Sequence, residues 1–293
     1  MKNKTRGTNV LGAAFALVTL GIVIFSIVYL TGHRSGLRPC FRPLERWGDR
    51  DFGSWKRTEE ERRVDEAFSS LRVQNISGSI EIRGWDRNYS LVRYTRQGPF
   101  TDELEVVIEL KNQTLSVYPV HANAMRKPPA SVSFEIAVPE DVHSIIAGSV
   151  SGSIELFGMG PEVDQELKTV SGRIETDNAG DLRASATSGP IRFRFSGREL
   201  YVKTVSGRVS GDILDLARGG TCELASVSGP VTLNAFKELD TRLALKSTSG
   251  TVHCEFPIQT AVRNKNLLEG TIGEGSSSIE ITSTSGSISL NRR

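Results

Sequence analysis

The sequence predicts an all-β protein: a β-solenoid, or parallel β-helix-like stack of rungs of roughly 18–22 residues, preceded by one N-terminal transmembrane helix. Three observations predict this fold. A five-residue phrase, in which Ser-Gly is followed after one residue by Ile or Val, recurs along the chain, with eight copies at the serines from Ser77 to Ser285 given below. Apolar and polar residues alternate around each phrase, as in a half-buried strand. The first 30 residues contain a long uncharged run.

The recurring phrase sets the length of the predicted rungs. From Ser151 the steps between serines are 20, 17, 18, 22 and 21 residues, and the last step, from Ser249 to Ser285, is 36, or two periods of about 18. The sixteen residues predicted to form structural turns are Ser77, Gly78, Ser151, Gly152, Ser171, Gly172, Ser188, Gly189, Ser206, Gly207, Ser228, Gly229, Ser249, Gly250, Ser285 and Gly286.

The copy around Ser188 shows how a rung is expected to fold. Apolar positions alternate before the pair at Leu182, Ala184 and Ala186, and after it at Ile191, Phe193 and Phe195. Glycine tolerates turn conformations without a Cβ clash, and serine can bond the nearby backbone. Stacking would place the Ile/Val positions in one internal column and the small residues two positions before Ser in another. Flexible linkers are also rich in Ser-Gly, but they lack this alternation.

The chain begins with a short basic segment, residues 1–9, followed by the uncharged run of residues 10–30. Twenty-one helical residues span roughly 31 Å, about the thickness of a bilayer core. No small-residue cleavage site follows the run, so we expect an uncleaved transmembrane signal anchor. Arginines flank the far side too, so the positive-inside rule does not favour an exported C-terminal part.

Three further segments follow the anchor. Residues 31–65 are predicted to be an Arg/Gly/Pro-containing tether, in which Thr58 and Glu61 fit a capping box and predict a short helix. Residues 66–140 hold longer strands and one Ser-Gly phrase, and are expected to form an N-terminal β part or cap. Residues 141–293 are expected to form the Ser-Gly repeat solenoid. A cap is needed because the open end of a solenoid exposes a strand edge.

No residue is predicted to be catalytic, cofactor-binding or metal-ligating. The four histidines have no metal-ligand spacing, and Cys254, beside His253, is expected to point inward. Asp177 and Asp181 flank a turn, where they are either part of an acidic groove or simply solvated. Cys222 and Cys254 fall on the inward alternation of neighbouring repeats, as free thiols or as a bridge. A net charge of +2 does not indicate a nucleic-acid partner.

Three stretches carry a resemblance to a known family: residues 75–86, the Pro-ended strand at 134–139, and the ending at 273–288. With the serial Ser-Gly phrases, they make residues 66–291 resemble a bacterial family of adhesin-like domains of unknown function. The resemblance implies an all-β, solenoid-like fold, often tethered to a bacterial membrane, without known catalytic residues or cofactors. Many members have Asp after Ser-Gly, where this chain has Ser, Arg, Pro or Thr.

The expected role is therefore that of a non-enzymatic protein of the bacterial cell envelope. The anchor makes the membrane a partner, and the resemblance favours a single-pass protein with its solenoid outside the cytoplasm. The solenoid would bind an unknown protein or a cell-wall polymer. Two alternatives stay open: a self-assembling or stress-related scaffold, and a polysaccharide-cleaving β-helix enzyme, which would need clustered acids that the sequence does not clearly show.

Overall fold

The computed structural model describes residues 55–99, 101–121, 130–140 and 142–293. They form an all-β structure of 21 strands with one short 3-10 turn, η1 (Thr101–Glu103). The predicted transmembrane helix at residues 10–30 lies outside the described residues. Within the described ranges, no helix is long and apolar enough to cross a membrane.

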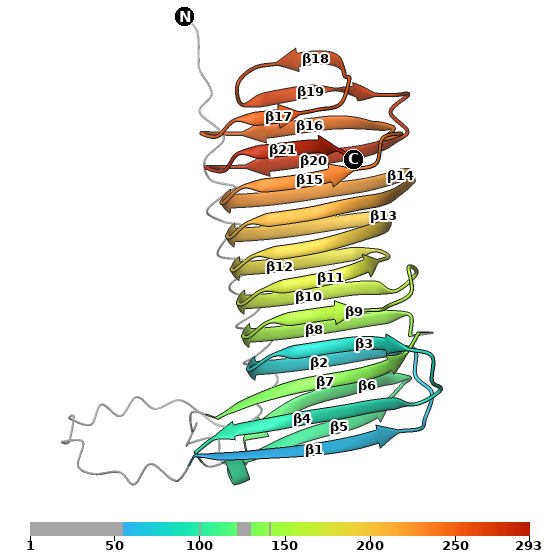
Figure 1. Ribbon diagram of the computed structural model, residues 1–293, viewed down its shortest axis with the longest axis vertical. Coiled ribbons are helices and arrows are strands. Elements are labelled where there is room, and N and C mark those ends of the chain that lie inside the picture. The colour runs from blue at the N-terminus through green and yellow to red at the C-terminus, as the bar shows by residue number, and fades with distance from the viewer. Residues whose placement is uncertain (1–54, 100, 122–129, 141) are drawn as a thin grey trace, which may run out of the picture. The chain divides into compact units, whose positions relative to one another are not determined.

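The strands form two ladders, one on each side of the Ser-Gly corners (Figure 1). The first ladder contains, in spatial order, β5 (Leu104–Lys111), β6 (Thr114–His121), β2 (Ser70–Ser77), β8 (Ser144–Ser151), β10 (Asp164–Ser171), β12 (Leu182–Ser188), the second halves of β13 (Ile191–Ser206) and β14 (Val209–Ser228), β20 (Ser277–Ser283), β16 (Thr241–Ser247), β19 (Leu267–Ile272) and β18 (Gln259–Arg263).

The second ladder contains, in spatial order, β1 (Lys56–Val64), β4 (Ser90–Gly98), β7 (Ser131–Pro139), β3 (Ile80–Trp85), β9 (Ile154–Phe157), β11 (Ile174–Ala179), the first halves of β13 and β14, β15 (Val231–Ala235), β21 (Ile288–Arg292) and β17 (Val252–Cys254). The central pairings of both ladders are parallel and in register, as stacked rungs require. Among the described strands, antiparallel pairs occur only at the two ends.

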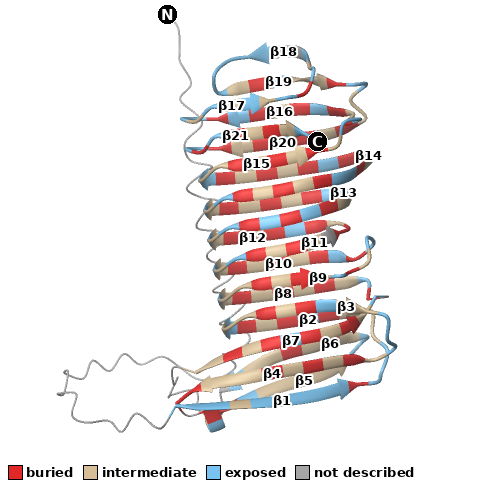
Figure 2. Cartoon of the chain, in the orientation of Figure 1, coloured by how far each residue is buried: buried red, intermediate tan, exposed pale blue. Residues whose placement is uncertain are grey.

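The core lies between the two ladders and follows the alternation read from the sequence (Figure 2). The Ile/Val position after each corner is fully buried in seven of the eight copies: Ile80, Ile154, Ile174, Ile191, Val209, Val231 and Ile288. The small residues before the corners are also buried: Asn75, Ser149, Thr169, Ala186, Thr204, Ser226, Ser283 and Ser247. Each buried Ile or Val contributes roughly 1.5–3 kcal/mol, so the apolar column is a main source of stability.

The rungs do not stack in sequence order at the C-terminal end. The rung made by β20 and β21, here called the inserted rung, lies between the rung of β14 and β15 and the rung of β16 and β17. The 36-residue step from Ser249 to Ser285 was predicted to be two periods, and this prediction is wrong. Its extra residues form β18 and β19, an antiparallel pair that continues the first ladder beyond β16.

At the N-terminal end, the structure corrects the predicted helix. Thr58 and Glu61 lie in β1, which pairs with β4, rather than in a capped helical turn. The period of two explains this outcome, because the side chains of β1 alternate between two sets of partners. Glu59 and Glu61 face Arg93, whereas Glu60 accepts a 2.6 Å hydrogen bond from the hydroxyl of Tyr94. Burial, followed by this bond, raises the pKa of Tyr94 to about 12.

Phe193 and Gly211 show how neighbouring rungs complement each other in volume. They are in register in β13 and β14, and a Cβ at residue 211 would lie 2.1 Å from Cζ of Phe193. Phe193 is 1% exposed, so its ring is enclosed by the core. The large ring therefore requires glycine on the next rung.

We expect Gly211→Ala to destabilise the protein by about 1–3 kcal/mol, the usual effect of overpacking a core. Phe193→Leu should also destabilise the protein by itself, since it leaves a gap. Combined, the two changes should be less harmful than their sum, because the shorter side chain makes room for the new methyl group. Urea midpoints of the two single variants and the double variant measure this coupling. Strict additivity would contradict the proposed contact.

The inserted rung is reached through a four-residue linker, residues 273–276, at the edge opposite the Ser-Gly corners. Gly273 and Gly275 have φ angles of 66° and 76°, a region that favours glycine. Oδ1 of Asp240 accepts hydrogen bonds from the backbone N–H groups of Gly275 at 2.6 Å and Ser276 at 3.3 Å. Hydrogen bonding by Ser276, and by these backbone groups, lowers the pKa of Asp240 below its usual value.

This lowered pKa predicts a pH dependence of stability. The charged carboxylate of Asp240 should stabilise the folded protein above its unfolded-state pKa, near 3.8, and the contribution should be lost as the pH falls through the lower folded-state pKa. We expect Asp240→Asn to lower the melting temperature at pH 7 and to differ less from the native protein near pH 3. Thermal melts of both proteins across this range check the expectation, and a constant difference would contradict it.

Candidate functional site

The eight Ser-Gly pairs lie along one edge of the stack, each between a strand of the first ladder and one of the second. Seven of the serines are exposed, and Ser77 is half-buried. Backbone bonds continue around the corner: the N–H of Gly207, for example, donates to the carbonyl oxygen of Ser228 at 3.1 Å. The pairs thus maintain the backbone bonding between rungs where the chain turns.

The glycines of these pairs form a continuous column in the order Gly78, Gly152, Gly172, Gly189, Gly207, Gly229, Gly286 and Gly250. A Cβ at any of them would lie 1.8–2.1 Å from a carbonyl oxygen of the rung beside it. At Gly207 this oxygen belongs to Gly189, 2.0 Å away. Glycine is required at Gly207 because of close backbone approach, since its φ lies outside the left-handed region.

A second column, which the sequence analysis missed, consists of four outward glutamates on the second ladder. Glu135, Glu81, Glu155 and Glu175, here called the glutamate ladder, occupy in-register positions on β7, β3, β9 and β11. Neighbouring strands are about 4.8 Å apart, so the carboxylates are close enough to repel one another. The signal in the sequence was the repeated Ile-Glu after the corners, whereas Glu135 has no Ser-Gly before it.

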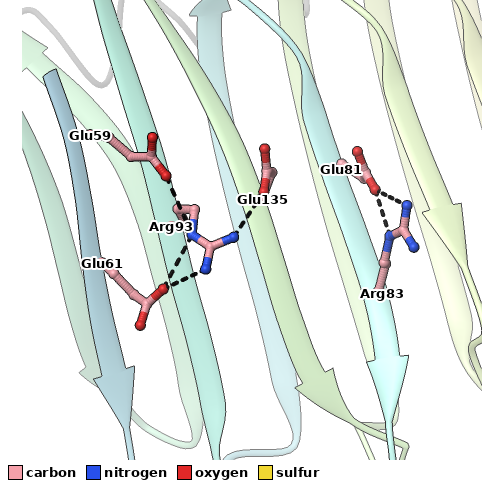
Figure 3. A network of polar contacts seen from close by, with 6 residues as sticks. All are labelled: Glu59, Glu61, Glu81, Arg83, Arg93 and Glu135. Carbon is pink, nitrogen blue, oxygen red and sulfur yellow. Dashed lines mark hydrogen bonds and ion pairs between the residues drawn. The ribbon is translucent and has the colours of Figure 1, made fainter. Parts of the chain in front are cut away.

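Arginines flank the glutamate ladder at both ends. Figure 3 shows Arg93 of β4 between Glu61 of β1, at 2.7 Å, and Glu135 of β7, at 3.5 Å. The hydrogen bond to Glu61, and then its charge, raises the pKa of Arg93. At the other end, Arg192 of β13 lies 3.4 Å from Glu175. These positive charges offset the repulsion along the column.

Arg83 supports the column from the side. It lies 2.5 Å from Glu81, two residues away on the same strand (Figure 3). Glu155, in contrast, makes no ion pair within the described part of the chain. The column therefore has one carboxylate whose charge is not matched by a side chain nearby.

Beyond Arg192, the same column continues with polar side chains that include no carboxylate. The in-register positions there are Ser210, Thr232, Ser289 and His253. In the neighbouring outward column, Asn291 donates to Asn234 at 2.9 Å, and Asn234 donates to Asp212 at 2.7 Å. The outer surface of the second ladder is thus a regular array, charged toward the N-terminal end and rich in hydroxyl and amide groups toward the C-terminal end.

The remaining candidate residues are explained by structural contacts. Asp177 accepts a backbone hydrogen bond from Gly158 at 3.0 Å, and Asp181 accepts two, from Arg198 at 2.9 Å and Glu199 at 2.7 Å. Each carboxylate therefore links its own rung to the backbone of a neighbouring rung. Within the described ranges, no three His, Cys, Asp or Glu side chains are grouped closely enough to hold a metal ion.

The two described cysteines, Cys222 and Cys254, are free thiols. The inserted rung separates them, because Cys222 is in register with Ile279 on one ladder and Cys254 with Leu290 on the other. They therefore do not lie on adjacent rungs, as consecutive repeats had suggested. Burial raises the pKa of both thiols, so neither is activated as a nucleophile.

The chain was compared with known protein families. The profile of the Toastrack DUF4097 family matches residues 65–291, a range that contains the described strands from β2 to β20 and most of β21. The chain belongs to the Toastrack DUF4097 family. The resemblance read from the Ser-Gly phrases and the three motif stretches is therefore confirmed. None of the curated proteins matches the chain.

Several solved structures are similar to this Toastrack DUF4097 chain at low identity. A candidate cell adhesion protein from Clostridium sporogenes is 15% identical, covering 81% of this chain and all of its own, with a TM-score of 0.39. A candidate adhesin from Bacteroides fragilis is 12% identical, covering 80% and 97%, also with a TM-score of 0.39. A candidate lipid-binding protein from Parabacteroides distasonis is 14% identical, covering 80% and 96%, with a TM-score of 0.29.

Proposed function

We propose that this Toastrack DUF4097 chain is a non-enzymatic, membrane-anchored envelope protein that binds an extended partner, a protein or a cell-wall polymer, along the second ladder. The observation that supports this most strongly is the register of that surface, where the glutamate ladder leads into rows of hydroxyl and amide groups. Parallel rungs repeat the same chemistry about every 4.8 Å. Such a surface suits a partner that is itself extended and repetitive.

The other two functions have less support. A polysaccharide-cleaving enzyme would need acids free to act on substrate, yet Asp177 and Asp181 bind backbone N–H groups, and three members of the glutamate ladder face arginines. End-to-end assembly would need an attractive strand edge. The edge strand β1 carries charges at seven of its nine positions, which disfavours edge pairing.

Binding can be tested with two matched triple variants of the full-length protein. Glu81→Gln, Glu155→Gln and Glu175→Gln remove three charges from the second ladder. Glu166→Gln, Glu223→Gln and Glu280→Gln remove three from the outer surface of the first ladder. We expect the first set, but not the second, to reduce co-sedimentation with purified cell-wall sacculi and to reduce the yield of envelope proteins cross-linked in intact cells. If the two sets behave alike, the second ladder is not the binding surface.

The anchor makes a separate prediction. Because residues 10–30 carry no charge, we expect the full-length protein to pellet with membranes and to resist carbonate extraction. A variant with Leu20→Arg and Val23→Arg should be released, since two charges at the bilayer centre are costly. We also expect added protease to digest the solenoid in intact spheroplasts. Recovery of the native protein in the soluble fraction would remove the anchor from the proposal.

A further inference from the structure

The inserted rung fills a slot that the rest of the chain leaves open. Among the described strands, β16 joins the stack only through β20, and β17 pairs only with β21. Backbone hydrogen bonds join the inserted rung to the rung on each side of it. Ser285 N–H donates to the carbonyl oxygen of Val227 on one side, and Ser249 N–H donates to that of Thr284 on the other, each at 3.0 Å. Without the inserted rung, both sides of the slot would expose unpaired strand edges.

The slot is selective for its occupant. At the corner, Gly286 fits so closely between its neighbours that a Cβ would lie 1.8 Å from the carbonyl oxygen of Gly229. Inside, the slot takes four apolar side chains that are at most 1% exposed: Ile279, Ile281, Ile288 and Leu290. Outside, it aligns Asn291 with Asn234. An occupant therefore needs the alternation and the Ser-Gly corner of this chain's own rung.

None of these contacts depends on which molecule supplies the rung. The partners of the inserted rung lie in β14, β15, β16 and β17, and its linker contributes only residues 273–276. Exchange of an identical element between copies preserves every such contact, and short hinges favour it. Four residues span at most about 14 Å, so two exchanging copies would meet at their linker edges.

We propose that the slot accepts the inserted rung of a second copy, so that two molecules exchange residues 277–292 and form a reciprocal dimer. Residues 273–276 are the hinge, and Asp240 holds it in the closed, monomeric form. The dimer is independent of the binding surface proposed above. Anchoring in one membrane would bring copies together in the same orientation and raise their local concentration.

A pair of engineered cysteines reports which molecule fills the slot. Asn234→Cys with Asn291→Cys places two thiols where the native amides meet at 2.9 Å, one on each side of the boundary of the inserted rung. Asp212→Cys with Asn234→Cys is the matched control, since its native contact of 2.7 Å lies between β14 and β15, outside the exchanged segment. The third cysteine of the sequence, Cys40, precedes the described residues. Cys40→Ser and Cys254→Ser remove background thiols, and Cys222 is fully buried. Each protein is folded in detergent, treated with a short bifunctional thiol reagent and run on a denaturing gel.

For the first pair, we expect covalent dimers whose fraction rises with protein concentration during folding. The control pair should give only internal cross-links, and single-cysteine Asn291→Cys should give few dimers. Inserting Gly-Ser-Gly-Ser after Glu274 should lower the dimer fraction about fivefold, because a longer hinge favours closure within one chain. Complete internal cross-linking of the first pair, with no covalent dimer at any concentration, would overturn the proposal. So would a dimer fraction that the control pair matches.

Discussion

Val209→Asp is expected to lower the free energy of unfolding by about 3–5 kcal/mol, the usual effect of leaving a charge buried without a partner. Val209 is fully buried in register with Ile191 on one side and Val231 on the other. An aspartate there would have an apolar side chain in register on each side, and the two rungs would restrict its access to solvent. Its carboxyl group should therefore be either neutral or strongly destabilising.

Two neighbouring residues provide graded controls for this prediction. Gly207→Val should cost about 1–3 kcal/mol, because its Cβ would meet the carbonyl oxygen of Gly189. Arg208 is exposed, and Arg208→Ser should change stability by no more than about 0.5 kcal/mol. The urea midpoint should therefore be lowest for Val209→Asp, intermediate for Gly207→Val and highest for Arg208→Ser. Equal midpoints would contradict the stacked-rung account of this corner.

Deletion of residues 277–293 is expected to detach the part of the structure beyond the slot. The deletion removes four fully buried apolar side chains, each contributing roughly 1.5–3 kcal/mol. It also removes the strands through which β16 and β17 join the stack. Residues 241–272 should then lose protection from hydrogen exchange, whereas the rungs from Ser144 to Ala235 should keep most of theirs.

Deletion of Arg293 alone is the control, since it leaves both strands of the inserted rung in place. It removes the 3.0 Å ion pair between Arg293 and Asp212. The Arg293 side chain is mostly exposed, so protection from hydrogen exchange should change little. Hydrogen exchange measured by mass spectrometry distinguishes the two deletions. If residues 241–272 remain protected in the longer deletion, they reach the stack by some contact other than the inserted rung.

Much of the fold could be predicted from the sequence because its determinants are local. The period of two around Ser188 identifies the buried residues of both strands, and the repeated glycine identifies the corner between them. The order of the rungs, in contrast, does not follow from local sequence. The phrases at Ser249 and Ser285 are nearly identical, so local pattern cannot decide which of them stacks on Ser228. Only the pairing of β14 with β20 decides it.

The outer surface was harder to predict than the core. Glu81, Glu155 and Glu175 share one position in the repeat, but Glu135 reaches the same column through β7, which has no Ser-Gly corner. Such a column depends on the register between strands that are distant in sequence. The local pattern gives no sign of it, because a charged residue is compatible with any outward-facing position of a strand. Thr58 and Glu61 show the converse, since a local capping pattern was overridden by pairing of β1 with β4.

Because of the inserted rung, the order in which the rungs stack differs from the order in which they are synthesised. A ribosome makes β16 and β17 before it makes β20 and β21, yet the former need the latter to join the stack. At roughly 5–20 residues per second, the nascent chain waits several seconds with two facing strand edges unpaired. During that interval the rungs up to Ala235 can already be folded, while their exposed edge is open to pairing with a neighbouring nascent chain. Translation speed over residues 255–276 should therefore influence how much of the protein folds alone and how much in pairs.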